Sequence, residues 1–320
     1  MKRLIECVPN FSEGRDLARI AALVAAVEGV SGAKVLDCHS DPDHNRSVVT
    51  FAGEPEAVAE AALAAVAKAT ELIDLNAHRG EHPRIGATDV LPFVPLQGVT
   101  MDECVALARR VGAEIWKRHQ IPVYFYESAA IRPTRAKLEN VRRGQFEALR
   151  DQVAGDPDRA PDVGAAQLHP TAGAVAVSAR KLLIAYNITL STTDVSIAKQ
   201  IARAIRASSG GLPAVKAIGI AVRSRGLAQV SMNLTDFEVT SIQRVFEAVR
   251  REAEGHACAI EGSEIVGLVP KRALDVTADY FFQLDSFSRE QVLEHRIATV
   301  FGESARRDSP VTRAARPTAS

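Results

Sequence analysis

The chain has few aromatic residues and few cysteines. Aromatic residues make up 5% of its 320 residues while apolar residues reach 47%, so the cores must consist mostly of Ala, Val, Leu and Ile. The four cysteines, at positions 7, 38, 104 and 258, show no C-x-x-C or zinc-like spacing. Scattered thiols argue against a disulfide scaffold and are typical of a reducing compartment. We therefore expect a soluble cytoplasmic protein.

An excess of charge of either sign is also absent. Lys and Arg total 39, as do Asp and Glu, so no long-range field toward nucleic acid or anionic membranes is expected. The longest apolar runs, such as residues 20–27, are far shorter than the ~20 residues that a membrane span requires. The N-terminal segment reaches Pro9 and Asn10 too soon to contain a secretory apolar segment. These absences predict no nucleic-acid or membrane partner.

Short strand-like segments alternate with longer helical patterns along the chain. In the first half, strands are expected at residues 3–8, 34–38, 47–53, 89–96 and 121–126, with helices over 14–28, from Pro55 and from near Thr100. In the second half, strands are expected at 181–190, 215–222, 227–234 and 264–270, with amphipathic helices at 194–211 and 239–255. The second half thus has the order β-α-β-β-α-β, and the first half begins in the same way and carries extra elements.

This pattern predicts an α/β fold of the α+β type with two subdomains. Each is expected to be a split β-α-β, ferredoxin-like sheet with helices on one face. The polar, turn-rich residues 150–164 are expected to form a long loop. We expect an N-terminal subdomain over residues 1–180, a C-terminal subdomain over 181–301, and a disordered polar tail over 302–320.

One polar segment contains the spacing H-x-x-E-H, formed by His78, Glu81 and His82. On a helix this spacing is the inverted signature of zinc peptidases. Two neighbours oppose a helix: Gly80 weakens it by about 0.8–1 kcal/mol relative to Ala, and Pro83 pushes His82 toward extended backbone. We therefore interpret the segment as a loop and expect no zinc there.

Two further segments concentrate polar or small residues. Residues 39–46 include His39, Asp41, Asp43, His44 and Arg46. Their carboxylates and imidazoles could form a metal cage, although turn-forming Asp-Pro and Asp-x-Asn explain part of the composition. Residues 164–173 are bounded by glycines that would let a ligand approach the backbone closely, with a plain linker as the alternative.

Several long blocks, in order along the chain, carry a family resemblance: ECVPNFSEGRD, NRSVVTFAG, RGEHPRIGATDVLPFVPL, GVTMDECV, RKLLIAYNI, LAQVSMNLTDFEVT and GSEIVGLVPKRAL. Together they resemble the glutamate formiminotransferase family, the transferase part of formiminotransferase-cyclodeaminase. The resemblance implies two α/β subdomains with a folate-binding tunnel between them, usually as a homodimer. It implies transfer of a formimino group from N-formimino-L-glutamate to N5 of tetrahydrofolate, in histidine degradation.

The resemblance also assigns residues and partners. It makes His82, in the GEHPR block, the catalytic residue. The implied partners are formiminoglutamate, folate polyglutamates and a separate cyclodeaminase that takes the product. The implied folate-contact residues are Gly164, Ala165, Ala166, Gln167, Leu168, His169, Pro170, Thr171, Ala172 and Gly173.

The chemistry of an amidine suggests further substrate contacts. One histidine can accept the proton of N5 and return it to the departing glutamate nitrogen. A protonated amidine is cationic, so Glu81, Asp41 and Asp43 are candidate stabilisers, with His44 beside them. The carboxylates of the donor need guanidinium partners, for which Arg46 and Arg84 are the local candidates. Arg180 and Lys181 are expected to favour the acidic folate tail.

Three alternatives stay open at this stage. A glutamate formyltransferase that uses 5-formyl-tetrahydrofolate would have much the same sequence. A metal-dependent amidine or amide hydrolase could use His39, Asp41, His44, His78 and His82. A folate-binding protein without catalysis would bind folate independently of His82.

Overall fold

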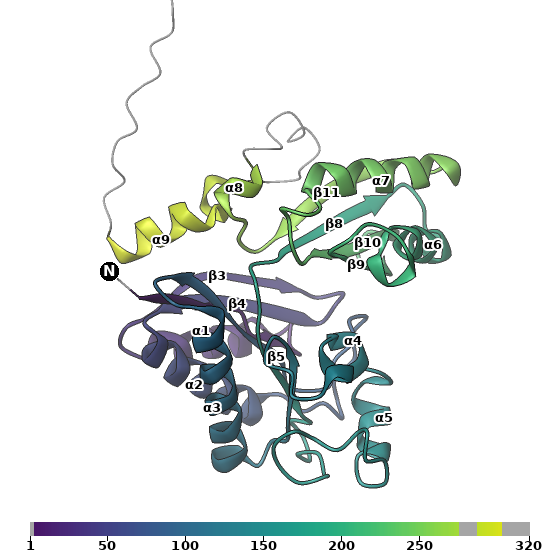
Figure 1. Cartoon of the computed structure of the whole chain (residues 1–320). Coiled ribbons are helices and arrows are strands. Elements are labelled where there is room, and N and C mark those ends of the chain that lie inside the picture. Colours follow the sequence, from purple (N-terminus) through teal and green to yellow (C-terminus); the bar gives the residue numbers. More distant parts are fainter. Residues whose placement is uncertain (1–2, 275–286, 303–320) are drawn as a thin grey trace, which may run out of the picture.

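A computed structural model describes residues 3–274 and 287–302 (Figure 1). The tail expected to be disordered, residues 302–320, lies outside the described residues except for Gly302. Two sheets divide the chain, and the division falls between Ala179 and Ile184. This arrangement confirms a mixed α/β fold with two subdomains. A boundary at residues 180/181 remains our proposal.

The first sheet contains a split β-α-β unit with additions. Its order is β3-β4-(β1, β2)-β5-β7-β6, in which β1 and β2 are two parts of one interrupted strand between β4 and β5. β7 pairs in parallel with β5 and with β6, so these last two strands extend the four-strand unit on one side. The strands are β1 (Leu4–Cys7), β2 (Asn10–Phe11), β3 (Ala33–Asp41), β4 (Arg46–Gly53), β5 (Thr88–Gln97), β6 (Val123–Glu127) and β7 (Val175–Ala179).

Three helices cover one face of the first sheet: α1 (Leu17–Glu28), α2 (Pro55–Leu72) and α3 (Met101–His119). Their starts follow local sequence signals. Asp16 caps α1, Pro55 occupies the first turn of α2, and Thr100 with Glu103 forms a capping box on α3. The small residues of α2 pack it closely against the large side chains of the sheet, such as Phe51 and Phe93. This is how a chain poor in aromatics builds a dense core.

The second sheet has the order β11-β8-β10-β9, with all pairs antiparallel. Together with the chain order, this is the predicted β-α-β-β-α-β subdomain, and the turn at residues 223–226 joins the predicted hairpin. The elements are β8 (Ile184–Leu190), α6 (Val195–Ile205), β9 (Val215–Val222), β10 (Leu227–Leu234), α7 (Ile242–Gly255) and β11 (Ile260–Val266).

The sheet faces without the long helices turn toward each other (Figure 1). Lys216 on β9 contacts the first subdomain: its Nζ lies 3.3 Å from Oε1 of Glu127 and 3.4 Å from Oε2 of Glu139. At one end, α9 (Leu293–Phe301) fills the space against the first sheet, because Leu293 packs with Leu36 and Ala52. α9 therefore packs against β3 and β4 of the first sheet.

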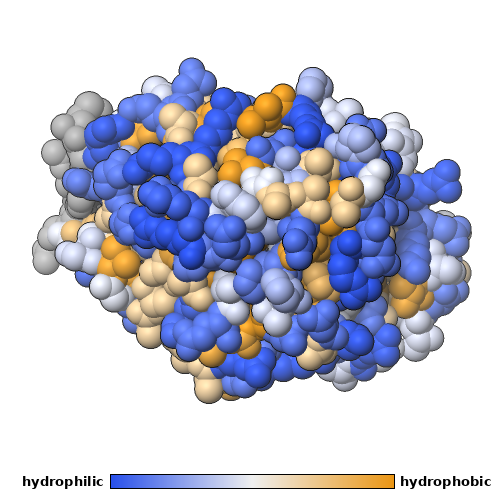
Figure 2. Space-filling model, turned by 90° about the horizontal axis from the view of Figure 1, so that it is seen from below, coloured by the Kyte–Doolittle hydropathy of each residue, from blue (hydrophilic) through white to orange (hydrophobic). Residues whose placement is uncertain are grey.

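The remaining elements are short. They are η1 (Pro133–Arg135), α4 (Leu138–Val141), α5 (Gln145–Gln152), η2 (Ala207–Ser209), α8 (Lys271–Leu274) and η4 (Arg289–Gln291). The sequence did not predict β2, β7, α4, α5, α8 and α9, and the loop expected at 150–164 begins as the end of α5. Within the described ranges, no helix combines the length and the apolar character that crossing a membrane requires. On the face in Figure 2, hydrophobic residues form separate patches among hydrophilic ones.

Gly219 on β9 provides a test of the packing in the second subdomain. A Cβ there would lie 2.3 Å from the backbone nitrogen of Lys199, so α6 would have to move away from the sheet. We expect Gly219→Ala to lower the free energy of unfolding by about 1–3 kcal/mol, the usual cost of overpacking. Urea unfolding measures this change. Gly255→Ala, where a Cβ meets open space, is the matched control and should change stability by less than about 0.5 kcal/mol. Equal stability of the two variants would contradict the described packing.

Candidate active site

Two polar segments singled out in the sequence, residues 39–46 and 76–87, pack directly against each other. A Cβ on Gly80 would lie 2.3 Å from the carbonyl oxygen of His44, so only glycine permits this approach. The Asn45 amide donates to the carbonyl of Arg79 at 2.9 Å and accepts from the backbone of Gly14. The 76–87 segment is not helical, so the H-x-x-E-H spacing does not form a zinc helix.

His82 is held in one tautomer. Its Nδ1 lies 2.8 Å from the carbonyl oxygen of Pro83, which can only accept, so Nδ1 carries the proton and Nε2 carries the lone pair. Burial, followed by the positive charges of Arg46 and Arg142, holds the pKa of His82 well below its usual 6.5. The imidazole is therefore neutral at neutral pH, with Nε2 able to accept a proton.

His44 stands beside His82. The two ring centroids are 5.9 Å apart, and the rings are tilted by 47°. Nδ1 of His44 lies 3.9 Å from an oxygen of Asp41, whereas its Nε2 is buried and has no hydrogen-bond partner in the described part of the chain. Burial lowers the pKa of His44, although Asp41 opposes the shift.

A buried charge cluster lies next to His82. Asp89 on β5 is fully buried and receives hydrogen bonds from Arg46 at 2.7 Å and from Arg142, which follows α4. Burial raises the pKa of Asp89, but Arg142 and Arg46 outweigh it and the net shift is downward. Burial also lowers the pKa of Arg46 to about 10, so it stays cationic at neutral pH. The cluster carries one net positive charge.

Arg142 keeps unused hydrogen-bonding capacity. Its Nε is buried without a partner among the described residues, and the only hydrogen bond of its side chain to a described residue is the one to Asp89. A guanidinium presents paired N–H groups that match a carboxylate. Arg142 and Arg46 can therefore receive an anionic group beside His82.

Arg84 and His78 stabilise the loop instead. Arg84 donates from Nη1 and Nη2 to the carboxylate of Glu147 at 2.8 and 2.7 Å, and from Nε to Nδ1 of His78 at 3.1 Å. Nε2 of His78 in turn lies 2.9 Å from the carbonyl of Asn45. A substrate carboxylate would have to compete with Glu147 for Arg84, so the contact predicted for Arg84 gains no support from this geometry.

The carboxylates predicted to stabilise a cation are engaged in structural contacts. Asp41 accepts from the backbone of Asp43 and His44 at 2.8 Å and so shapes its own turn. Asp43 accepts from the hydroxyl of Ser224 at 2.6 Å, and Glu81 pairs with Arg223 at 2.7 Å. Residues 223 and 224 belong to the β9–β10 turn. These contacts therefore join both segments, residues 39–46 and the loop that contains His82 (the His82 loop, residues 76–87), to the second subdomain.

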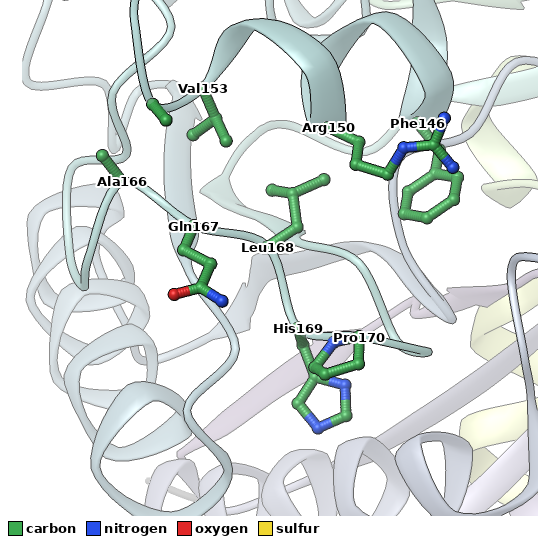
Figure 3. Close-up of a pocket in the computed structure, with 9 residues that line it drawn as sticks. Phe146, Arg150, Val153, Ala166, Gln167, Leu168, His169 and Pro170 are labelled. Atoms are coloured by element: carbon green, nitrogen blue, oxygen red, sulfur yellow. The ribbon is translucent and has the colours of Figure 1, made fainter.

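The segment from Gly164 to Gly173 has two parts. Its end is joined to the His82 segment, because Gly173 pairs with Gly86 and the backbone of Ala87 donates to Ala172. Residues 166–170 line a pocket of about 320 Å³ together with α5. Figure 3 shows Leu168 at the centre of this pocket, between Val153 and Phe146. This volume is at the lower end of the range for small-molecule sites.

The predicted contacts for an acidic tail lie apart from that pocket. Lys181 is exposed and pairs with Asp236 at 2.8 Å. Arg180 is buried near Glu6, a buried carboxyl whose pKa burial raises to about 7 although Arg180 opposes the shift. Neither residue lines that pocket.

The histidines and carboxylates proposed for a hydrolase do not converge. Among the described residues, no group of three or more His, Cys, Asp or Glu side chains has the geometry to hold a metal ion. His78 uses both ring nitrogens on protein partners, and Asp41 is committed to its turn. The metal-dependent hydrolase therefore has no assembled ligand set in this part of the chain.

Comparison with known proteins gives consistent matches over both subdomains. The model of the formiminotransferase domain, N-terminal subdomain, matches residues 4–180, and that of the formiminotransferase domain matches residues 185–303. A glutamate formimidoyltransferase of Streptococcus pyogenes serotype M1 is 44% identical, over 93% of this chain and 99% of the relative. Its namesake in Thermoplasma acidophilum is 45% identical, over 92% and 97%.

A longer relative matches equally well over the same region. The formimidoyltransferase-cyclodeaminase of Rattus norvegicus is 43% identical over 94% of this chain, but the match spans only 56% of that relative. The resemblance inferred from the GEHPR block and its neighbours thus extends over both sheets. The chain belongs to the formiminotransferase family.

Proposed function

We propose that the chain is a glutamate formimidoyltransferase. It transfers the formimino group of N-formimino-L-glutamate to N5 of tetrahydrofolate, giving 5-formimino-tetrahydrofolate and glutamate, in histidine degradation. Relatives with this name match nearly the whole chain. The observation that carries the proposal is His82, a neutral imidazole with an available lone pair, beside the two guanidinium groups of the Asp89 cluster.

His82 moves the proton. As the bond between N5 and the formimino carbon forms, Nε2 accepts the proton from N5. As the bond from that carbon to the glutamate nitrogen breaks, Nε2 returns the proton to the departing amine. The lowered pKa of His82 makes its protonated form a strong acid, which favours this return.

The arginines hold the anionic end of the donor. Arg142 offers its unpaired Nε, and Arg46 binds the same oxygen of Asp89. Both guanidiniums are fixed by Asp89, so little conformational entropy is lost when a carboxylate binds. In this proposal the carboxylates of the donor bind to Arg46 and Arg142, beside His82.

Tetrahydrofolate is proposed as a co-substrate. Residues 166–170 line a pocket, and residues 172 and 173 bind the segment that follows His82, which supports the folate-contact assignment for Gly164–Gly173. Arg180 and Lys181 are the proposed contacts for the acidic tail. A homodimer, a cytoplasmic location and handover to a separate cyclodeaminase remain predictions from the family.

His82→Asn tests the proposed acid–base role. We expect kcat to fall about 100-fold or more, because Asn cannot accept and return a proton. The dissociation constant for tetrahydrofolate should change little. His256→Asn, at the end of α7 in the second subdomain, is the control and should keep full activity. Normal turnover by a folded His82→Asn protein would remove His82 from the mechanism.

Arg142→Gln tests the charge cluster in two ways. It should lower kcat/KM for formiminoglutamate about 10- to 100-fold, the scale of a hydrogen bond to a charged group. It should also raise the pKa of His82, since Arg142 lowers it. Activity requires neutral His82, so the acid limb of the kcat/KM profile should move to higher pH. Arg143→Gln, an exposed neighbour, is the control. An unchanged acid limb would mean that Arg142 does not act on His82.

Treatment with a strong zinc chelator should leave turnover unchanged. The reason is that the side chains of His39, Asp41, His44, His78 and His82 do not converge on a common point. Activity is measured before and after prolonged dialysis against the chelator, with buffer dialysis as the control. Loss of turnover that zinc restores would favour the metal-dependent hydrolase.

A further inference from the structure

A set of polar side chains covers the inner face of the second sheet. Asn187 and Thr189 on β8, Gln229 on β10 and Glu264 on β11 are neighbours in the strand register. The alternating residues of β8, such as Ile188, point to the opposite face and pack under α6 and α7. The polar set therefore lies on the face that is turned toward the first subdomain (Figure 1). Asn187, Thr189 and Gln229 are buried there.

Hydrogen bonds within the set fix the orientation of each group. Asn187 donates to Oε1 of Glu264 at 3.0 Å, and the Gln229 amide donates to Thr189 at 3.2 Å and to the same Oε1 at 3.4 Å. Because a carboxylate only accepts hydrogen bonds from these amides, the nitrogen of Gln229 must point toward Glu264. The amide oxygen of Gln229 then points away from these partners.

Two acceptors in this set have no partner. Oε1 of Gln229 is buried and has no hydrogen bond in the described part of the chain, and the residue as a whole is only 5% exposed. Oε2 of Glu264 accepts no hydrogen bond from any described residue, since both bonds to the carboxylate end on Oε1. An unpartnered buried acceptor such as Oε1 of Gln229 is costly, and the half-buried Glu264 carboxylate beside it is accessible, so a ligand with N–H donors is the natural partner for both.

The set lies near the end of the second sheet that contacts the two loops of the site, because Gln229 is the third residue of β10 and the turn before β10 binds Asp43 and Glu81. The negative charge of Glu264 opposes the downward shift in the pKa of His44, whose ring centroid lies 5.9 Å from that of His82. The buried Nε2 of His44 is likewise unpartnered among the described residues. The Asp89 cluster is positive and lies beside His82, so Glu264 supplies the opposite charge on the other subdomain.

We propose that Glu264 binds the protonated formimino group of the donor and makes the enzyme select formimino over formyl donors. This inference rests on the proposed formimidoyltransferase function and adds its specificity determinant. The formimino group as an amidinium is planar, positive and rich in N–H donors, which Oε2 of Glu264 and Oε1 of Gln229 complement. A formyl group is neutral and offers an oxygen acceptor at the same place. Oε2 of Glu264 and Oε1 of Gln229 would then face the formyl oxygen, which is also an acceptor. This mismatch disfavours binding of the formyl donor.

The position of Glu264 favours the donor over the pterin, whose ring edge also carries adjacent N–H groups. The formimino nitrogen is one bond from the carbon that reacts beside His82. The nearer candidates for this charge, Asp41, Asp43 and Glu81, are already bound to protein groups. Glu264 therefore fills the role that the chemistry requires and that those residues do not fill.

Glu264→Gln is the decisive variant, because Gln can keep the acceptor toward Asn187 and Gln229 while removing the charge. We expect kcat/KM for formiminoglutamate to fall about 10- to 150-fold. The KM for tetrahydrofolate should stay within about twofold. Inhibition by N-formyl-L-glutamate should become stronger or stay the same, because Gln removes the acceptor charge that faces the formyl oxygen. The preference for the formimino compound over its formyl analogue should therefore shrink by at least the same factor. Glu264→Asp, which keeps the charge, should retain more of that preference than Glu264→Gln.

The control is Glu261→Gln, an exposed carboxylate on the same strand, which should behave as the unmodified protein. A thermal unfolding curve for each variant shows that it is folded. If the unmodified protein transfers formimino groups and Glu264→Gln does so equally well, the inference is wrong. A rise in the KM for tetrahydrofolate alone would also overturn it, because Glu264 would then bind the pterin. Absence of transfer by the unmodified protein would instead refute the proposed function.

Discussion

The buried carboxylate of Asp89 is the group on which the geometry of the site depends. One of its oxygens accepts from Arg46 and Arg142, and the other accepts from the backbone of Ile85 at 2.9 Å, three residues after His82. A single side chain thus joins β4, the His82 loop and the end of α4. Removal of Asp89 would leave both guanidiniums uncompensated, and removing one partner of a buried ion pair typically costs about 3–5 kcal/mol. The cluster is therefore a fixed frame, and His82 is positioned by it.

The same cluster also sets the electrostatics of the site. Its two guanidiniums and one carboxylate give a net positive charge beside His82. This charge contributes to the low pKa of His82 and attracts anions. Glu264, on the facing sheet, supplies a negative side. Formiminoglutamate has a matching distribution of charge, with two carboxylates at one end and a protonated amidine at the other. Its reactive carbon would then lie between the two sides, where a neutral histidine can move a proton. In the proposed reaction the two subdomains are needed together, because each provides one of these charges.

Much of the fold could be predicted from the sequence because its signals are local. The helices carry apolar stripes and caps, such as Thr100 with Glu103, and most of the strands are bounded by turn residues. The missed elements lack such signals. β7 consists of small or β-branched residues that are buried on both faces between β5 and β6, so it shows no alternation. β2 has only two residues and continues β1 after a break, which only the pairing with β4 and β5 reveals.

The candidate site was predictable only in part, for a related reason. His82 and the loop at residues 39–46 stand out by composition, and Gly80 indicates that something approaches its backbone closely. Composition also drew attention to Asp41, Asp43 and Glu81. Charged residues in a turn-rich loop, however, often form the hydrogen bonds and ion pairs that stabilise the loop itself. They cap the turn or bind Arg223 and Ser224. Arg142 and Glu264 lie far away in sequence and have ordinary local surroundings. What distinguishes them is hydrogen-bonding capacity that remains unused after folding, and only the tertiary structure reveals it. For a buried site between two subdomains, unused donors and acceptors are therefore a better guide to substrate contacts than the density of charge along the chain.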